Sequence, residues 1–212
     1  MIDLRQEGKG CRKSCALTSI ITTDNWRALI VNGTTTPDFV YVRRNTNLND
    51  FVSMNSMDFR CNVGGQASAK STRVATVEAG SKVGMTNIVG AAHIGPVMFY
   101  MSKAPNGDVT TYDGRGDWFK VYEIGPTISG GHLAWTTNNM ASFTFSLPKD
   151  IPDGQYLLRG ERLALHIANQ PQWYIGVSMR RSRTGRYLMV PLQIVRSLKC
   201  GRRRDRCSWA DS

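Results

Sequence analysis

The sequence predicts an all-β protein, an antiparallel β-sandwich with long loops and irregular basic extensions at both ends. Three observations predict this fold class. Short apolar runs rich in valine, isoleucine, phenylalanine and tyrosine recur along the 212 residues. Clusters of glycine, asparagine, aspartate and proline separate the runs, as turns separate strands. No long apolar pattern follows the helical period of about 3.6 residues, so a sandwich is favoured over a helical fold.

Eight runs are expected to form strands, because each is rich in the β-branched and aromatic residues that suit a pleated, half-buried surface. Turn signals stand beside them: Asn32-Gly33 follows the first run, Asp113-Gly114 precedes the fifth and Pro152-Asp153-Gly154 precedes the seventh. Residues 45–71 are polar and read as a long surface loop. In chain order the runs are RALIV (27–31), FVYVRR (39–44), TRVATVEA (72–79), PVMFYMSK (96–103), WFKVYE (118–123), ASFTFSL (141–147), QYLLRGERLALHIA (155–168) and QWYIGVSM (172–179).

The positive charge gathers at the two ends of the chain. The net charge is 27 − 16 = +11, but residues 16–179 hold 13 basic and 12 acidic side chains. The first fifteen residues carry +2 and residues 180–212 carry +8. We therefore expect three parts: an atypical N-terminal extension (1–22), the sandwich (23–179) and a basic, cysteine-containing tail (180–212). A solvated tail is the favoured reading, and no nucleic-acid motif supports the alternative of a basic nucleic-acid binder.

No stretch of the sequence approaches the roughly 18 consecutive apolar residues of a membrane helix, so no membrane partner is expected. The N-terminal segment makes a poor secretory signal, because its apolar run is short and interrupted. Five cysteines are present, and only Cys61 lies in the body of the chain. No histidine lies near enough in sequence to the other four to complete a recognisable zinc pattern.

One long run carries a histidine on its polar side. In a strand over 155–168, the period of two places Leu163, Leu165 and Ile167 on one face. His166 then projects from the opposite face. By the same rule Gln172 and Tyr174 project together from the next strand, so a histidine, a glutamine and a tyrosine can meet at one patch. A hydrogen-bonded histidine and tyrosine at a sheet edge is the structural alternative.

His93 stands before Ile-Gly-Pro at the mouth of another expected strand. It is either a solvated loop residue or, with His166 and Tyr174, a candidate metal ligand. Imidazole suits copper and zinc, and a phenol can act as a weak further ligand. Two imidazoles alone make a poor site. The sequence shows no recognisable pair of carboxylates for glycoside hydrolysis, no Gly-x-Ser-x-Gly nucleophile motif and no phosphate-binding loop. Catalysis by the usual organic side chains therefore has little support.

Six stretches together carry a family resemblance. From about Trp26 to Tyr174 the chain is similar to the fungal lytic polysaccharide monooxygenases of auxiliary activity family nine. The resemblance implies an immunoglobulin-like sandwich, a secreted monomer and one copper ion on a flat face. It also implies an external electron donor and oxidative cleavage of β-1,4-glycosidic bonds in cellulose or a related β-glucan. The stretches are ALIVNGTTTPDFVYVRR, DFRCNVG, AAHIGPVMFYMSKAP, DWFKVYEIGPTISGG, IPDGQYLLRGERLALHIA and QPQWYIG.

The resemblance assigns roles to four residues. His93 matches a copper ligand and Tyr174 matches the axial tyrosine. His166 and Gln172 match the catalytic pair that hydrogen-bonds the oxygen co-substrate. The Arg159 and Glu161 positions match a family motif to which we assign only a supporting role, and the residues that bind substrate are not identified.

Three departures from the family limit this expectation. The family begins with a histidine that supplies two of the three nitrogen ligands, whereas this sequence has Thr23 near that position and no histidine before His93. Weak copper binding and doubtful activity are therefore expected. Cys61 matches a disulfide cysteine whose partner position is Val177 here, so its thiol is expected to be free unless Cys200 or Cys207 pairs with it. The family's C-terminal segment is replaced by the basic tail.

Two explanations of these departures stay open. Both ends are misassigned coding sequence around a copper enzyme, or the chain is a relative that has lost its metal ligands and binds cellulose or another glycan without cleaving it.

Overall fold

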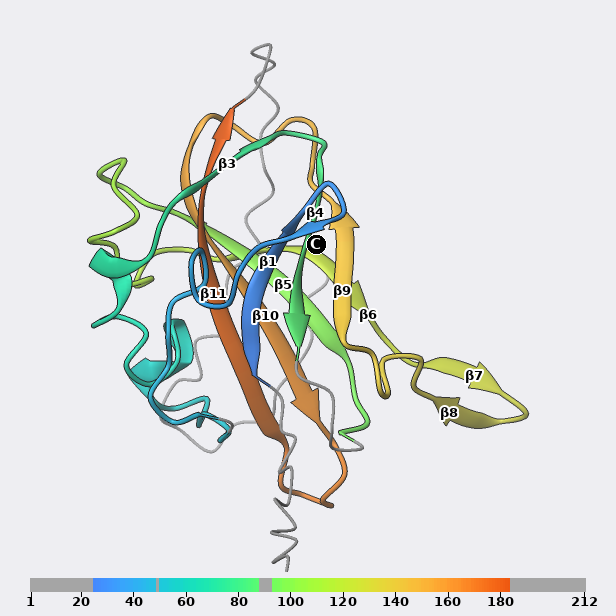
Figure 1. Ribbon diagram of the computed structural model, residues 1–212. Helices are drawn as coiled ribbons and strands as arrows, with labels where there is room; N and C mark the ends of the chain where they lie inside the picture. Colours follow the sequence, from blue (N-terminus) through green and yellow to red (C-terminus); the bar gives the residue numbers. More distant parts are fainter. Residues whose placement is uncertain (1–24, 49, 88–92, 184–212) are drawn as a thin grey trace, which may run out of the picture.

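Two β-sheets pack face to face in the structure, a computed structural model that describes residues 25–48, 50–87 and 93–183 (Figure 1). One sheet has four strands in the order β2-β1-β4-β9, and the other has five in the order β3-β11-β10-β5-β6. The first comprises β1 (Trp26–Val31), β2 (Thr34–Thr35), β4 (Lys82–Asn87) and β9 (Ser142–Ser146). The second comprises β3 (Ala75–Glu78), β5 (Val97–Lys103), β6 (Phe119–Ile124), β10 (Gly154–Ala164) and β11 (Gln172–Arg183).

The sandwich confirms the predicted fold class, and its pairing is antiparallel except between β11 and β3, which run parallel. β11 extends to Arg183, past residue 179 where the sequence places the end of the sandwich. The extensions over 1–24 and 184–212 lie outside the described residues. Within the described part of the chain, no helix is long and apolar enough to cross a membrane.

One strand prediction was wrong, and the six-residue strand β4 was missed. Residues 39–44 form no strand, and Val42 alone makes a bridge, to Ser178. Phe39 has a left-handed backbone (φ 57°), a conformation that interrupts an extended run. β4 was not predicted, because Gly84 stands in its middle and glycine is a poor strand former. The sheet needs that glycine, since a Cβ there would overlap the carbonyl oxygen of Phe143 on β9.

Trp26 lies at the centre of the main core, between the two sheets. Its ring contacts Phe99 and Phe143 at centroid distances of 5.6 and 5.8 Å. Gly160 and Gly176 make room for it, because a Cβ on either residue would press against the tryptophan. The indole N–H donates to the carbonyl of Tyr174 over 3.1 Å, which ties the four-stranded sheet to the start of β11.

The inner face of β11 turns polar beyond Gly176. Ser178, Arg180 and Ser182 alternate along the strand and are all buried. Within the described residues, both serine hydroxyls and the Nε and Nη1 groups of Arg180 have no hydrogen-bond partner. The remaining guanidinium nitrogen, Nη2, contacts the sulfur of Met101. Burial lowers the pKa of Arg180 to about 9.

Cys61 is buried on the outer side of the five-stranded sheet and has no disulfide partner among the described residues, while Cys200 and Cys207 lie outside them. It packs in one cluster with Val177. An N–H of the Arg43 guanidinium donates to its sulfur over 3.1 Å. Burial raises the pKa of the Cys61 thiol, and the charge of Arg43 opposes that effect without reversing it.

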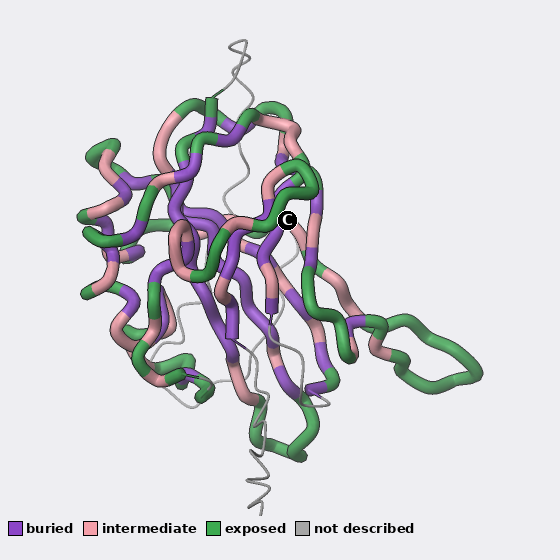
Figure 2. Tube along the Cα trace, in the orientation of Figure 1, coloured by how far each residue is buried: buried purple, intermediate pink, exposed green. Residues whose placement is uncertain are grey.

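Residues 45–71 are largely irregular, as predicted for a long loop, with two short 3₁₀ turns, η1 (Met57–Arg60) and η2 (Ala69–Ser71). A hairpin of β7 (Thr127–Ser129) and β8 (His132–Ala134) projects away from the sandwich (Figure 1). All six of its strand residues are exposed, and Figure 2 shows the whole projection in the colour of exposed residues. Its apolar cross-strand pair, Ile128 and Leu133, is 80% and 63% exposed.

Candidate metal centre

Four side chains singled out from the sequence meet at one end of the five-stranded sheet. The His93 ring stacks on the ring of His166 at 4.7 Å and on the ring of Tyr174 at 4.6 Å between centroids. The hydroxyl of Tyr174 donates to the side-chain oxygen of Gln172 over 2.9 Å. We call these four residues the His–Tyr cluster.

His93 is 7% exposed, so it is not the solvated loop residue of the alternative reading. It begins a turn that continues through Ile94, Gly95 and Pro96 into β5. Gly95 has a φ of 149°, and a Cβ there would overlap the carbonyl oxygen of Leu163. The turn therefore lies directly against the end of β10, and only a glycine permits that approach.

Hydrogen bonds fix the same turn from two sides. The backbone amides of Leu163 and Leu165 donate to the carbonyls of Pro96 (3.1 Å) and Ile94 (2.8 Å). The hydroxyl of the buried Thr137 donates to the carbonyl of Gly95 over 2.6 Å. These contacts hold the turn to β10 and to the segment after β8.

Tyr174 and Gln172 share a face of β11, as the period of two predicts. Tyr174 is buried, while Gln172 is partly exposed at the start of the strand. The backbone of Tyr174 is held by the ladder pairing with Arg162 on β10 and by the indole of Trp26.

The alternation argument for His166 was wrong, although His166 does lie in the cluster. β10 ends at Ala164, so Leu165, His166 and Ile167 belong to the turn that follows. The face expected to be polar is the buried one, because Ala164 is fully enclosed whereas Leu165 and Ile167 are about 40% exposed. His166 reaches His93 through the turn and is itself exposed.

The donor atoms of the His–Tyr cluster suit copper in kind, since imidazole and phenol groups are among its protein ligands. Their number is small: no group of three or more histidine, cysteine, aspartate or glutamate side chains gathers for a metal within residues 25–48, 50–87 and 93–183. An imidazole binds metal through a lone pair in its ring plane. Two stacked rings therefore hold their lone pairs in nearly parallel planes. One ring has to turn before both rings can bind the same ion.

Arg159 and Glu161 lie on the outer face of β10 and form a buried ion pair, with 2.6 Å between Nε and Oε1. The guanidinium stacks on Trp118 at 4.0 Å and lies near Phe59 and Tyr100. Burial raises the pKa of Glu161, and the charge of Arg159 opposes it. The pair faces away from the core, and the Arg159 guanidinium donates to the Phe59 carbonyl over 3.4 Å, which joins η1 to the sheet. A supporting role for the pair stays a prediction.

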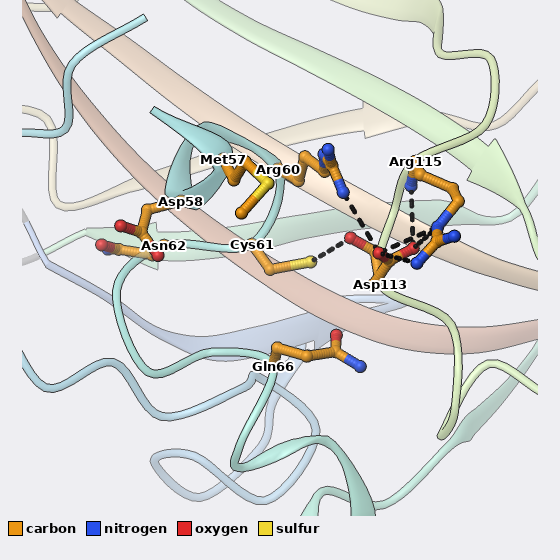
Figure 3. A pocket seen from close by; sticks show the side chains of 8 residues that line it. All are labelled: Met57, Asp58, Arg60, Cys61, Asn62, Gln66, Asp113 and Arg115. Atoms are coloured by element: carbon orange, nitrogen blue, oxygen red, sulfur yellow. Dashed lines mark hydrogen bonds and ion pairs between the residues drawn. The ribbon is translucent and has the colours of Figure 1, made fainter. Parts of the chain in front are cut away.

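A shallow cavity of about 550 Å³ opens elsewhere, beside Cys61 (Figure 3). Three of its charged side chains pair with one another, because Arg60 and Arg115 contact Asp113 over 3.1 and 3.0 Å. The hydrogen bond from Arg115 is the main reason that the pKa of Asp113 is lowered. No residue of the His–Tyr cluster lines this cavity.

The chain matches known proteins over the same region. Residues 24–178 match the family described as Auxiliary Activity family 9 (formerly GH61). Lytic polysaccharide monooxygenase G of this family from Aspergillus tamarii is 47% identical over 150 residues, which cover 65% of this chain and 45% of that protein. Monooxygenase C from Emericella nidulans is 39% identical over 145 residues, which cover 66% and 62%. The chain thus spans about half the length of these relatives.

Solved structures agree with the sequence comparison. The crystal structure of HiLPMO9B superposes with a TM-score of 0.67 at 28% identity, covering 81% of this chain and 83% of that one. A cellulose-active polysaccharide monooxygenase from M. thermophila gives 0.68 at 24% identity, covering 79% and 81%, which shows the shared fold. The chain belongs to auxiliary activity family 9, the family of these lytic polysaccharide monooxygenases.

Proposed function

We propose that the His–Tyr cluster is the copper site of a secreted, monomeric monooxygenase that oxidatively cleaves β-1,4-glycosidic bonds in cellulose or a related β-glucan, using an external electron donor. His93 would hold the copper through its imidazole, and the phenol of Tyr174 would act as a weak further ligand. The observation that carries the proposal is the stacking of His93 on both His166 and Tyr174, because these rings come from three separate segments of the chain.

The protein's own groups have distinct tasks in this proposal. Copper, when bound, supplies the redox chemistry with the oxygen co-substrate. The turn at Gly95 fixes the backbone of His93, and burial shields that ring from water. Gln172 holds the phenol of Tyr174 in one orientation. The exposed imidazole of His166 can donate or accept a proton at the surface where substrate arrives.

Copper binding by the chain as written is expected to be weak. The three histidines are His93, His132 and His166, so no histidine precedes the cluster in sequence. The family's first residue contributes an amine and an imidazole, and Thr23 stands near its position.

Titration with Cu(II), followed by electron paramagnetic resonance, tests the site. We expect one weakly bound ion, lost in His93→Ala and kept in His132→Ala, whose histidine lies on the exposed hairpin. Equal binding by all three proteins would contradict the assignment of His93. A shortened chain that begins at residue 23 with T23H is expected to bind copper more tightly, because it regains two nitrogen donors.

A second function, binding of cellulose without cleavage, is favoured by the missing histidine. Adsorption to cellulose and mass spectrometry of the soluble sugars separate the two. Oxidised oligosaccharides that appear only with copper and a reductant support the enzyme. Adsorption with no oxidised product under the same conditions supports the non-catalytic relative.

A further inference from the structure

Arg162 is an arginine that faces the interior of the sandwich at the end that carries the His–Tyr cluster. It is 1% exposed and lies in β10, paired with Val97 on one side and with Tyr174 on the other. Cross-strand partners project from the same face of a sheet, so Arg162 and Tyr174 share the inner face. This contact is not evident from the sequence, because a strand pattern does not show what an inward arginine contacts.

The guanidinium of Arg162 hydrogen-bonds to the backbone carbonyl of His93. Its Nε and Nη2 groups both donate to the His93 carbonyl, over 3.2 and 2.9 Å. Nη2 also donates to the carbonyl of Thr137 over 3.2 Å. A rigid, planar fork that places two N–H groups on one oxygen fixes the direction of that peptide as well as its distance.

The hydrogen bonds from Arg162 are part of a larger set that holds the same turn. The Thr137 carbonyl accepts a hydrogen bond from Arg162, and the Thr137 hydroxyl donates one to the Gly95 carbonyl. The contacts through Leu163 and Leu165 hold Ile94 and Pro96. Those bonds fix the residues after His93, whereas Arg162 holds the carbonyl of His93 itself, the residue whose ring lies in the cluster.

We propose that Arg162 is a positioning residue for His93: by holding the His93 carbonyl it keeps the imidazole stacked on the rings of His166 and Tyr174. The significance for catalysis rests on the proposed function, in which His93 binds copper. The effect on the ring is a property of the metal-free protein. Groups that orient a metal ligand commonly change metal affinity by about 10–100-fold when they are removed.

The first test reads the ring without copper. A proton held over a neighbouring aromatic face is shielded, so the ring protons of His93 in the wild-type protein are expected to resonate upfield of a free imidazole. In Arg162→Met these signals should move back toward the free position and broaden. Arg180→Met is the matched control, since it removes another buried arginine from the same interior without touching the turn. Its His93 signals should stay in place.

The second test measures Cu(II) affinity of the same full-length proteins. Arg162→Met is expected to bind about 10–100-fold more weakly, and Arg180→Met as tightly as the wild type. Arg162→Lys keeps the charge but loses the fork, so it should fall between them. If Arg162→Met does not fold, the ring signals of His93 are measured in Arg162→Lys and in Thr137→Val. Thr137→Val removes the hydrogen bond to the Gly95 carbonyl, and Thr137→Ser is its control because serine keeps the hydroxyl.

Unchanged His93 signals in a folded Arg162→Met protein, or in a folded Arg162→Lys protein, would overturn the proposal. The failure of the proposed function looks different. If the wild-type protein binds no copper while the ring signals shift in Arg162→Met, Arg162 positions His93 in a site that serves another ligand.

Discussion

Arg180 places a guanidinium inside the apolar core between the two sheets. Two of its nitrogens lack partners in the described structure, and burial lowers its pKa because the charged form loses its hydration. A buried polar group without a partner costs about 1–3 kcal/mol. We expect Arg180→Met to raise the free energy of unfolding by about that amount, measured by urea denaturation. Arg181→Met, on the exposed face of the same strand, should change it by less than about 0.5 kcal/mol. A lower urea midpoint for Arg180→Met would contradict this account.

Tyr156 makes stability depend on alkaline pH. Burial raises the pKa of its phenol to about 12, whereas an unfolded tyrosine titrates near 10. Between these values the unfolded chain has lost the proton and the folded protein still holds it, so stability falls as pH rises. The free energy of unfolding of Tyr156→Phe, measured by denaturant titration, should fall less steeply between pH 10 and 11 than that of the wild type. The variant also loses the hydrogen bond from the hydroxyl to the Pro152 carbonyl, and a measurement at pH 8 gives the cost of that loss separately. Parallel slopes for the two proteins would contradict the prediction.

The direction in which a site residue projects was predictable from the sequence for residues within a strand, but not for residues beyond the end of one. Gln172 and Tyr174 lie within β11, so the period of two placed them correctly. His166 lies two residues beyond β10, where alternation no longer applies. The contact of Arg162 with His93 joins residues 69 positions apart, and no local pattern reports such a bond.

Among the elements, strands that follow composition were predictable and those shaped by partners were not. Phe39 to Arg44 has strand composition, but Phe39 is left-handed and the segment pairs with β11 only through the single bridge of Val42 to Ser178. Lys82 to Asn87 contains a glycine and still pairs on both sides, because β1 and β9 supply the partners. In both cases the surrounding structure overrides the strand propensity of the segment.

The β7–β8 hairpin is an element with almost no packing. A two-stranded hairpin alone is marginally stable in water, and its apolar pair faces solvent. We expect its backbone amides to exchange with deuterium at nearly the rate of an unstructured chain, while those of β5 and β10 are protected. Ile128→Thr should leave the global unfolding free energy within about 0.5 kcal/mol of the wild type. Strong protection in the hairpin would show that something covers it in solution.

At the scale of the whole molecule, Cys61 and Val177 join the long loop to the centre of the five-stranded sheet. They pack in one cluster, and the Val177 carbonyl accepts the backbone amide of Arg43 over 2.8 Å. Val177→Cys is expected to form a disulfide with Cys61 and to add about 2–4 kcal/mol to the unfolding free energy under oxidising conditions. Thiol counting in denaturant and urea midpoints with and without reductant measure this. Val177→Ser controls for the lost side chain. A denatured Val177→Cys variant with one free thiol more than the wild type, rather than one fewer, would refute the pairing.

The order in which the chain is synthesised bears on the His–Tyr cluster. His93 leaves the ribosome 81 residues before Tyr174 (174 − 93), and β10 pairs with β5 on one side and β11 on the other. A nascent chain that stops short of β11 has His93 but lacks the phenol and amide that complete the cluster. If the cluster binds copper as proposed, the complete site forms only after synthesis has passed Tyr174, and copper loading would then follow folding rather than guide it.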